Sequence, residues 1–210
     1  MHFSETIVVD DGSSDGTAAL MERYARPSVQ LIRNPGNRGK GYAVRNGMLS
    51  ARGEWILYTD ADLSTPIEEA DKLYCAARAK EAVIAIGSRA VDRSLVEVHQ
   101  SVFREYSGRS FNLVMRLLTG LPFEDTQCGF KLFEASAARA IFSRQLLDGF
   151  SFDVENLFIA KQCGLRAIEV PVRWANVEGS KVSLSQGIRS FLDLLTIRRN
   201  GLAGKYRCPS

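Results

Sequence analysis

The sequence predicts an α/β protein, a three-layer α/β/α domain built on a mainly parallel central sheet. Short apolar runs rich in β-forming residues alternate with longer segments of helical periodicity along the 210 residues. Acidic or basic residues stand directly after several of these runs, and ligands bind beyond the carboxyl ends of strands in open α/β sheets. The composition is 45% hydrophobic and 24% charged, which suits one globular domain with a sizeable core. We therefore expect a single domain over residues 1–210.

The elements follow from residue type and period. Strands are expected where β-branched and aromatic residues cluster, and helices where apolar residues recur after N-cap residues or glycines. The expected strands are 6–9, 29–33, 55–58, 82–89, a short strand after Gly129 and a pair around Pro171. The expected helices are a first one ending near residue 25, then 41–51, 67–80, 101–118, one beginning at Ala135, one within 150–164, and 186–200.

The segment from Trp55 to Thr65 organises the rest of the chain. Its apolar run ends at Tyr58, and two carboxylates, Asp60 and Asp62, follow with only Ala61 between them. Two crowded acids at a strand end repel each other, and oxygen donors suit Mg²⁺ or Mn²⁺. The motif alone also fits a solvated turn in which one aspartate caps the next helix.

The first expected strand ends in a similar way. Asp10 and Asp11 follow it and could accept hydrogen bonds from a nucleotide, although a turn rich in capping residues is the simpler interpretation. After the second expected strand comes "NPGNRGKGYAVRNG", which includes Lys40 and leads into a helix. Such a loop can cradle phosphate at a helix N-terminus, but its spacing is not that of a P-loop.

Composition and residue counts limit the other functions. The net charge of +3 and sequence pI of about 8.7 suit an anionic ligand or a membrane surface, but are too weak to indicate nucleic acid. The 4 cysteines lack C-x-x-C spacing, which argues against zinc and predicts reduced thiols in a cytosolic setting. No apolar run approaches the roughly 18–20 residues that span a bilayer, and no signal peptide is recognisable.

Two helices carry charges that need an interpretation. Asp153 and Glu155 fall in the first turn of their helix, where the simplest role is to complement the helix dipole. The helix 186–200 has apolar residues on one side and arginines near its ends, so it fits either a core helix or a membrane-interface helix. Its apolar residues are Ile188, Phe191, Leu192 and Leu195, and its arginines are Arg189, Arg198 and Arg199.

Several motifs occur in one order: "VVDDGSSDGT", "NRGKGYAVRNG", "TDADLS", "GSR", "DTQCGFKLF", "FDVE" and "VEGSKVS". Together they resemble the family 2 glycosyltransferases, which have the GT-A (nucleotide-diphospho-sugar transferase) fold. Within that family the chain is similar to the dolichyl- or polyprenyl-phosphate sugar transferases, most of all to the dolichyl-phosphate β-glucosyltransferases. The resemblance covers nearly the whole chain.

The resemblance implies an inverting enzyme that moves a hexose from UDP-glucose or GDP-mannose to a polyprenyl or dolichyl phosphate. The mannosyl type commonly has glutamine two places after the second aspartate of the D-x-D motif, where this chain has Ser64, so glucose is favoured. We expect a cytoplasmic protein that is peripheral at the cytoplasmic face of a membrane. The acceptor could instead be a polysaccharide.

The resemblance also assigns roles. Asp62 would bind the metal ion, with Asp60 supporting the metal or the ribose, while Asp10, Asp11 and Lys40 would hold the nucleotide sugar. Asp125 matches the position of the catalytic base. A phosphomonoester is already largely anionic at pH 7, however, so Asp125 could orient a cation or sugar hydroxyls instead. The cations expected to hold the acceptor phosphate are Arg89, Arg104, Arg109, Lys131 and Lys181.

One departure from the family pattern leads to a further expectation. Members of the family begin with a strand and a "P-x-Y-N-E"-like turn before "VVDDGS", and this chain starts at "MHFSETIVVDDGS". Without that strand its neighbours would have unpaired backbone groups, so we expect a truncated or misassigned start and an unstable or inactive form. A non-catalytic nucleotide-sugar-binding remnant therefore stays open. A sugar nucleotidyltransferase is a third reading, but its early glycine-rich signature is not seen.

Overall fold

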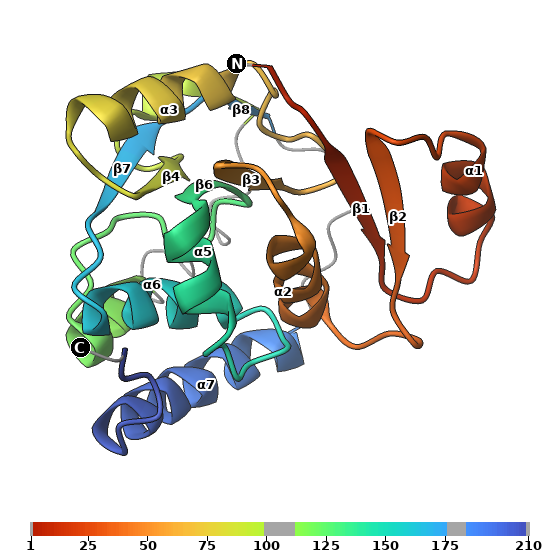
Figure 1. Ribbon diagram of the computed structural model, residues 1–210. Helices are drawn as coiled ribbons and strands as arrows, with labels where there is room; N and C mark the ends of the chain where they lie inside the picture. Colours follow the sequence, from red (N-terminus) through yellow and green to blue (C-terminus); the bar gives the residue numbers. More distant parts are fainter. Residues whose placement is uncertain (1, 99–111, 176–183, 209–210) are drawn as a thin grey trace.

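A mixed sheet of four strands lies at the centre of the computed structural model, which describes residues 2–98, 112–175 and 184–208 (Figure 1). Its strands, in spatial order, are β3 (Trp55–Thr59), β6 (Phe130–Glu134), β4 (Ile84–Ser88) and β7 (Ala167–Pro171). β4 and β7 are parallel, whereas β6 runs antiparallel to both β3 and β4. The predicted α/β class is confirmed, and the sheet contains one reversed strand in its interior.

Helices cover both faces of this sheet, which gives the three layers. On one face α3 (Glu69–Ala79) buries Ala70, Leu73 and Ala77 against the sheet. The other face carries α2 (Lys40–Ser50), α5 (Ala135–Phe142) and α6 (Phe152–Gln162). A second, larger core lies there, and α7 (Leu184–Leu202) packs against α6 below it (Figure 1).

Beside the central sheet, β1 (Thr6–Asp10) and β2 (Val29–Arg33) form a separate parallel pair, covered by α1 (Thr17–Arg23) (Figure 1). Because backbone groups alternate in direction along a strand, those of Ile7 and Val9 point away from β2. In the part of the chain that the structure describes, no strand pairs with the other edge of β1 or with the other edge of β3. Each of these edges is therefore without a strand partner among the described residues.

The remaining elements are short. The 3₁₀ turn Arg93–Leu95 leads into β5 (Val96–Val98), which pairs in parallel with β8 (Trp174–Ala175). Residues 112–119 are helical, so the described part of the expected helix 101–118 agrees with it. The final helix extends two residues beyond the expected 186–200 at each end.

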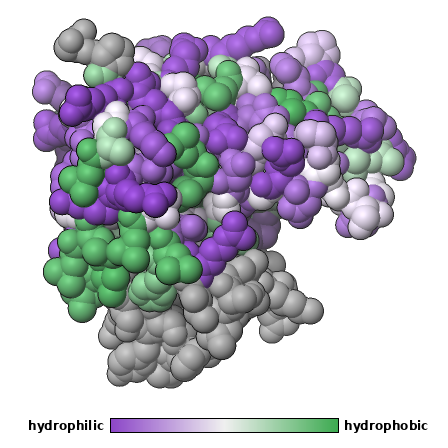
Figure 2. Space-filling view, turned by 90° about the horizontal axis from the view of Figure 1, so that it is seen from below, coloured by the Kyte–Doolittle hydropathy of each residue, from purple (hydrophilic) through white to green (hydrophobic). Residues whose placement is uncertain are grey.

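The helix 112–119 and α7 each expose leucines to solvent. On the helix 112–119, Leu113 is 61% and Leu117 76% exposed, and on α7 Leu192 is 59% and Leu195 55% exposed. The opposite faces of the same helices bury Met115, Leu194 and Ile197 in the larger core. Seen from below, where α7 lies in Figure 1, hydrophobic residues form a continuous patch (Figure 2). The helix 186–200 is thus partly a core helix and partly a surface one.

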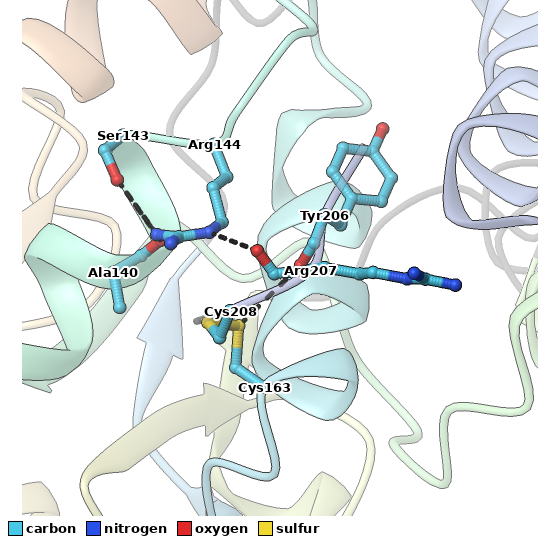
Figure 3. Close-up of a disulfide and its surroundings, with 7 residues drawn as sticks. All are labelled: Ala140, Ser143, Arg144, Cys163, Tyr206, Arg207 and Cys208. Carbon is cyan, nitrogen blue, oxygen red and sulfur yellow. Dashed lines mark hydrogen bonds between the residues drawn. A yellow bond between two sulfur atoms is a disulfide. The ribbon is translucent and has the colours of Figure 1, made fainter. Parts of the chain in front are cut away.

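The prediction that the cysteines are reduced thiols is wrong for two of them. Cys163, at the end of α6, forms a disulfide with Cys208 in the C-terminal tail, 45 residues away in sequence (Figure 3). Figure 3 also shows Arg144 donating a hydrogen bond from Nε to the carbonyl of Arg207, 3.0 Å away. The tail folds back on α6, and this tertiary contact is not visible in cysteine spacing. The cytosolic setting was expected because the cysteines were predicted to be reduced, and the disulfide removes that reason.

Among the described residues, no helix is both long and apolar enough to cross a bilayer.

Candidate active site

Three charged or polar segments meet at the end of the central sheet where the carboxyl ends of β3 and β4 lie, which we call the sheet edge. Asp60 follows the carboxyl end of β3 and Arg89 that of β4, and both strands run antiparallel to β6, so the segment before β6 reaches the same edge. The backbone N–H of Asp60 donates to the carbonyl of Gly129 at 3.0 Å. A Cβ on Gly129 would overlap the Asp60 carboxylate, so any other residue here would require this carboxylate to move.

Lys40 brings the glycine-rich loop to this edge. Its Nζ lies 2.8 Å from Oδ1 and 3.0 Å from Oδ2 of Asp60. Burial lowers the pKa of Lys40, but the carboxylates of Asp153, Asp60 and Asp62 outweigh burial, so the pKa is raised. Lys40 is therefore a cation at the first turn of α2, where the helix dipole also attracts an anion.

Asp10 and Asp11 have structural partners in this molecule. Asp11 accepts hydrogen bonds from the side chain of Asn34 at 2.8 Å and from the backbone N–H groups of Arg38 at 3.1 Å and Gly39 at 2.8 Å. Asp10 accepts one from the N–H of Ser13 at 3.0 Å. Asp11 thus shapes the loop that carries Lys40. Nucleotide binding by Asp10 and Asp11 stays a prediction.

Asp125 is clamped by Arg89. The guanidinium donates from Nε to Oδ2 at 2.6 Å and from Nη2 to Oδ1 at 2.8 Å. Burial raises the pKa of Asp125, but the charge and hydrogen bonds of Arg89 outweigh it and hold the pKa below its usual range. Both oxygens of the carboxylate are occupied, so in this state Asp125 orients a cation.

Lys131 lies beneath the edge and is fully buried. Its Nζ donates to Oδ1 of Asp153 at 2.6 Å, to the hydroxyl of Tyr58 at 3.3 Å and to the carbonyl of Cys128. Tyr58 donates its own hydroxyl to the same Asp153 oxygen at 2.6 Å. An acceptor phosphate could reach Lys131 only if this cluster rearranged.

The interpretation of Asp153 and Glu155 as dipole partners was incomplete. Both lie in the first turn of α6, but both are buried and have specific partners: Lys131 and Tyr58 for Asp153, and Tyr206 for Glu155. Sequence reasoning missed Tyr58 and Asp153 as site residues. The sequence held two signals. Tyr58 places an aromatic hydroxyl two residues before the first aspartate of the D-x-D motif, and Asp153 belongs to the "FDVE" segment that carries part of the resemblance.

The structure brings together most of the expected site residues. Lys40, Asp60, Asp62, Arg89, Asp125 and Lys131 surround the carboxyl ends of β3 and β4, and Asp10 and Asp11 adjoin them through the glycine-rich loop. Arg104, Arg109 and Lys181 lie outside the described residues. Close to the site, the Cys128 thiol is buried, and burial raises its pKa to about 11.

The residues at this edge fit a divalent ion only if the ligand completes the site. Among the described residues, no group of three or more His, Cys, Asp or Glu side chains is placed to hold a metal ion. Asp62 is exposed and accepts a hydrogen bond at Oδ1 from the N–H of Ser64 at 3.0 Å, while Asp60 is paired with Lys40. Mg²⁺ commonly takes one or two protein carboxylates and the rest from water and phosphates, which matches Asp60 and Asp62.

Known proteins resemble this chain in sequence and in fold. A dolichyl-phosphate beta-glucosyltransferase of Trichomonas vaginalis is 38% identical over 200 residues, covering 92% of this chain and 59% of the relative. One of Drosophila melanogaster is 38% identical over 216 residues, covering 98% and 66%. The chain thus spans about three fifths to two thirds of the length of these curated relatives.

The fold is shared with more distant proteins. A crystal structure of glucosyl-3-phosphoglycerate synthase from Mycobacterium tuberculosis, in complex with Mn²⁺, uridine-diphosphate-glucose and phosphoglyceric acid, has a TM-score of 0.63 at 14% identity, covering 92% of this chain and 68% of that one. The expected GT-A fold is confirmed by this neighbour. The profile described as Glycosyl transferase family 2 matches residues 3–147, and this chain belongs to that family.

Proposed function

We propose that this chain is the catalytic domain of an inverting glycosyltransferase that moves glucose from UDP-glucose to dolichyl or another polyprenyl phosphate. The observation that carries the proposal is the cationic and acidic edge of the sheet in a chain 38% identical to two dolichyl-phosphate beta-glucosyltransferases. Glucose is preferred to mannose because Ser64 replaces the glutamine typical of the mannosyl type.

The donor diphosphate would lie at the N-terminus of α2. Lys40 and the positive end of the helix dipole supply positive charge there, and Asp11 fixes the loop that presents Lys40. Asp60 and Asp62 would hold Mg²⁺ or Mn²⁺ beside the diphosphate, where the ion supplies charge neutralisation for the departing nucleotide. The Mn²⁺ complex of the mycobacterial synthase supports this assignment.

The acceptor needs positioning more than it needs a base. A phosphomonoester with a second pKa near 6 is largely doubly charged at pH 7, so its oxygen can attack the sugar without losing a proton. Arg89 is 28% exposed on its side chain while it clamps Asp125, so part of this side chain faces solvent at the site. Asp125 would hold Arg89 in place for that phosphate, and we assign the remaining positive charge to Arg104, Arg109 and Lys181.

A lipid-linked acceptor requires a membrane surface, and α7 supports one. The helix 112–119 and α7 carry exposed arginines as well as exposed leucines. These arginines are Arg116, Arg198 and Arg199. An apolar face bordered by cations fits the interface of a membrane that contains anionic lipids. We therefore propose peripheral attachment through residues 186–200 and leave open which face of the membrane is bound, because the disulfide removes the argument for the cytosol.

The direct test is a transfer assay with purified protein, Mn²⁺ and dolichyl phosphate in detergent. UDP-glucose should support transfer at least about tenfold faster than GDP-mannose, since one poorly fitted contact costs about a factor of ten. Faster transfer from GDP-mannose would reverse the sugar assignment, and transfer only to a polysaccharide would replace the acceptor. Binding of UDP-glucose by calorimetry without any transfer would identify a nucleotide-sugar-binding remnant.

A further inference from the structure

We infer that Tyr206 and Glu155 are positioning residues for the donor diphosphate, acting through the segment 145–149 on the first turn of α2. The inference rests on the proposed function, because it names residues that tune the same site. Neither residue lies at the sheet edge, and neither touches Lys40. A series of hydrogen bonds connects the C-terminal tail through Glu155 and the segment 145–149 to the glycine-rich loop.

Glu155 is the centre of this series. Its buried carboxylate accepts hydrogen bonds from the backbone N–H of Leu146 at 3.1 Å and of Leu147 at 2.8 Å. Tyr206 donates its hydroxyl to Oε1 of Glu155 at 2.6 Å. A buried carboxylate needs such donors to stay in a low-dielectric interior, so the two amides and the hydroxyl share in fixing it.

The segment that Glu155 holds lies directly against α2. The carbonyl of Asp148 accepts hydrogen bonds from the N–H of Gly41 at 2.8 Å and of Tyr42 at 3.3 Å. Gln145 donates from Nε2 to the carbonyl of Gly41 at 2.9 Å, and Arg45 lies 2.9 Å from the carboxylate of Asp148. The first turn of α2 is therefore bonded to the segment by both its N–H and its C=O groups.

The backbone of the first turn of α2 lies in direct contact with the backbone of the segment 145–149. A Cβ on Gly39 would overlap the carbonyl of Asp148, and one on Gly41 would lie 2.7 Å from the carbonyl of Leu147. Lys40 stands between these two glycines and reaches Asp60. A shift of the segment must therefore move the backbone of Lys40.

The tail that carries Tyr206 is itself anchored. The disulfide between Cys163 and Cys208 ties the tail to the end of α6 (Figure 3). Asn200 donates from Nδ2 to the hydroxyl oxygen of Tyr206 at 3.1 Å, and the ring of Tyr206 packs 6.1 Å from that of Phe158, centroid to centroid. These contacts leave the hydroxyl one direction in which to donate, toward Glu155.

The experiment compares Tyr206→Phe with the control Tyr74→Phe, which also removes one hydroxyl but from a tyrosine packed on Trp55 in another layer. Tyr206→Phe should raise the KM for UDP-glucose about fivefold, the effect of one lost hydrogen bond, and leave the KM for dolichyl phosphate unchanged. Hydrogen exchange at the amides of Gly41 and Tyr42 should accelerate by a similar factor. The control should change neither quantity. Glu155→Gln should act in the same direction and more strongly.

A merely structural role predicts another pattern. If Tyr206→Phe lowers the melting temperature but leaves exchange at Gly41 and Tyr42 and the KM for UDP-glucose unchanged, the inference is wrong. The exchange measurement does not depend on activity. If the wild type transfers no sugar, the proposed function fails while the exchange rates still decide this inference, and if Glu155→Gln does not fold, Tyr206→Phe alone decides it.

Discussion

The ammonium group of Lys40 lies within 3.0 Å of both carboxylate oxygens of Asp60. This ion pair joins the start of α2 to the end of β3 at the edge where the site residues gather. The side chains are 27% and 36% exposed, so a ligand can reach both. A diphosphate there would meet the cation of Lys40 and, beside it, the acids that suit a divalent ion.

Asp62 is the exposed acid of the pair. Asp62→Ala should reduce Mn²⁺-dependent transfer by at least about 100-fold, because a metal ligand is lost, while the free energy of unfolding changes by less than about 1 kcal/mol. Initial rates across a Mn²⁺ titration and urea unfolding measure the two effects. Glu68→Ala removes another exposed acid and is the control. Wild-type turnover in Asp62→Ala would end the metal assignment.

The clamp on Asp125 should appear in the pH dependence of stability. Arg89 holds the folded-state pKa of Asp125 below the ordinary 3.8, so the folded state binds fewer protons than the unfolded state near that pH. The stabilisation is fully present above pH 3.8 and is lost as the pH falls through the lowered folded pKa. Urea unfolding between neutral pH and acid should show a shallower acid loss in Asp125→Asn than in the wild type. Equal slopes would show that Arg89 does not stabilise the ionised form.

The buried pair of Lys131 and Asp153 should be costly to break. Lys131→Met leaves the Asp153 carboxylate without its cation and should lower the free energy of unfolding by about 3–5 kcal/mol. The double variant Lys131→Met/Asp153→Asn removes both charges and keeps an acceptor for Tyr58, so it should recover most of that loss. Urea unfolding of the two single variants and the double variant measures the coupling energy. Additive losses would contradict the pairing.

The leucines of α7 should govern membrane attachment. Leu192→Glu/Leu195→Glu should weaken co-sedimentation with vesicles of phosphatidylcholine and phosphatidylserine at least about tenfold, since buried leucines contribute about 1.5–3 kcal/mol each. Leu20→Glu, at a 50% exposed leucine of α1, is the matched control. Unchanged sedimentation of the α7 variant would place the membrane contact elsewhere or remove it.

The role of Lys181 in binding the acceptor phosphate is predicted from the sequence alone, and Lys181 lies outside the described residues. Lys181→Ala should raise the KM for dolichyl phosphate by about tenfold and the KM for UDP-glucose much less, because a charged hydrogen bond to phosphate is lost. Lys80→Ala, at an exposed lysine after α3, is the control. The reverse pattern would move Lys181 to the donor site.

The sequence was sufficient for features that depend on neighbouring residues. The strands β2 and β3, the helices α2 and α3, and the position of Asp60 and Asp62 after β3 all follow from local periodicity and turn residues. Lys40, Arg89 and Asp125 were predicted as site residues because they fall in motifs, and motifs are also local. The predicted GT-A fold and its family were likewise present in the order of those motifs.

Only the tertiary structure decided which of these groups pair. Asp153 binds Lys131 from 22 residues away and Tyr58 from 95, and Cys163 reaches Cys208 across 45. The antiparallel pairing of β6 with β3 and β4 is likewise long-range, with Phe130 and Leu132 packed in one core and Phe133 in the other. Periodicity records which face of an element is buried but not which distant side chain meets it there, because that choice is made by packing.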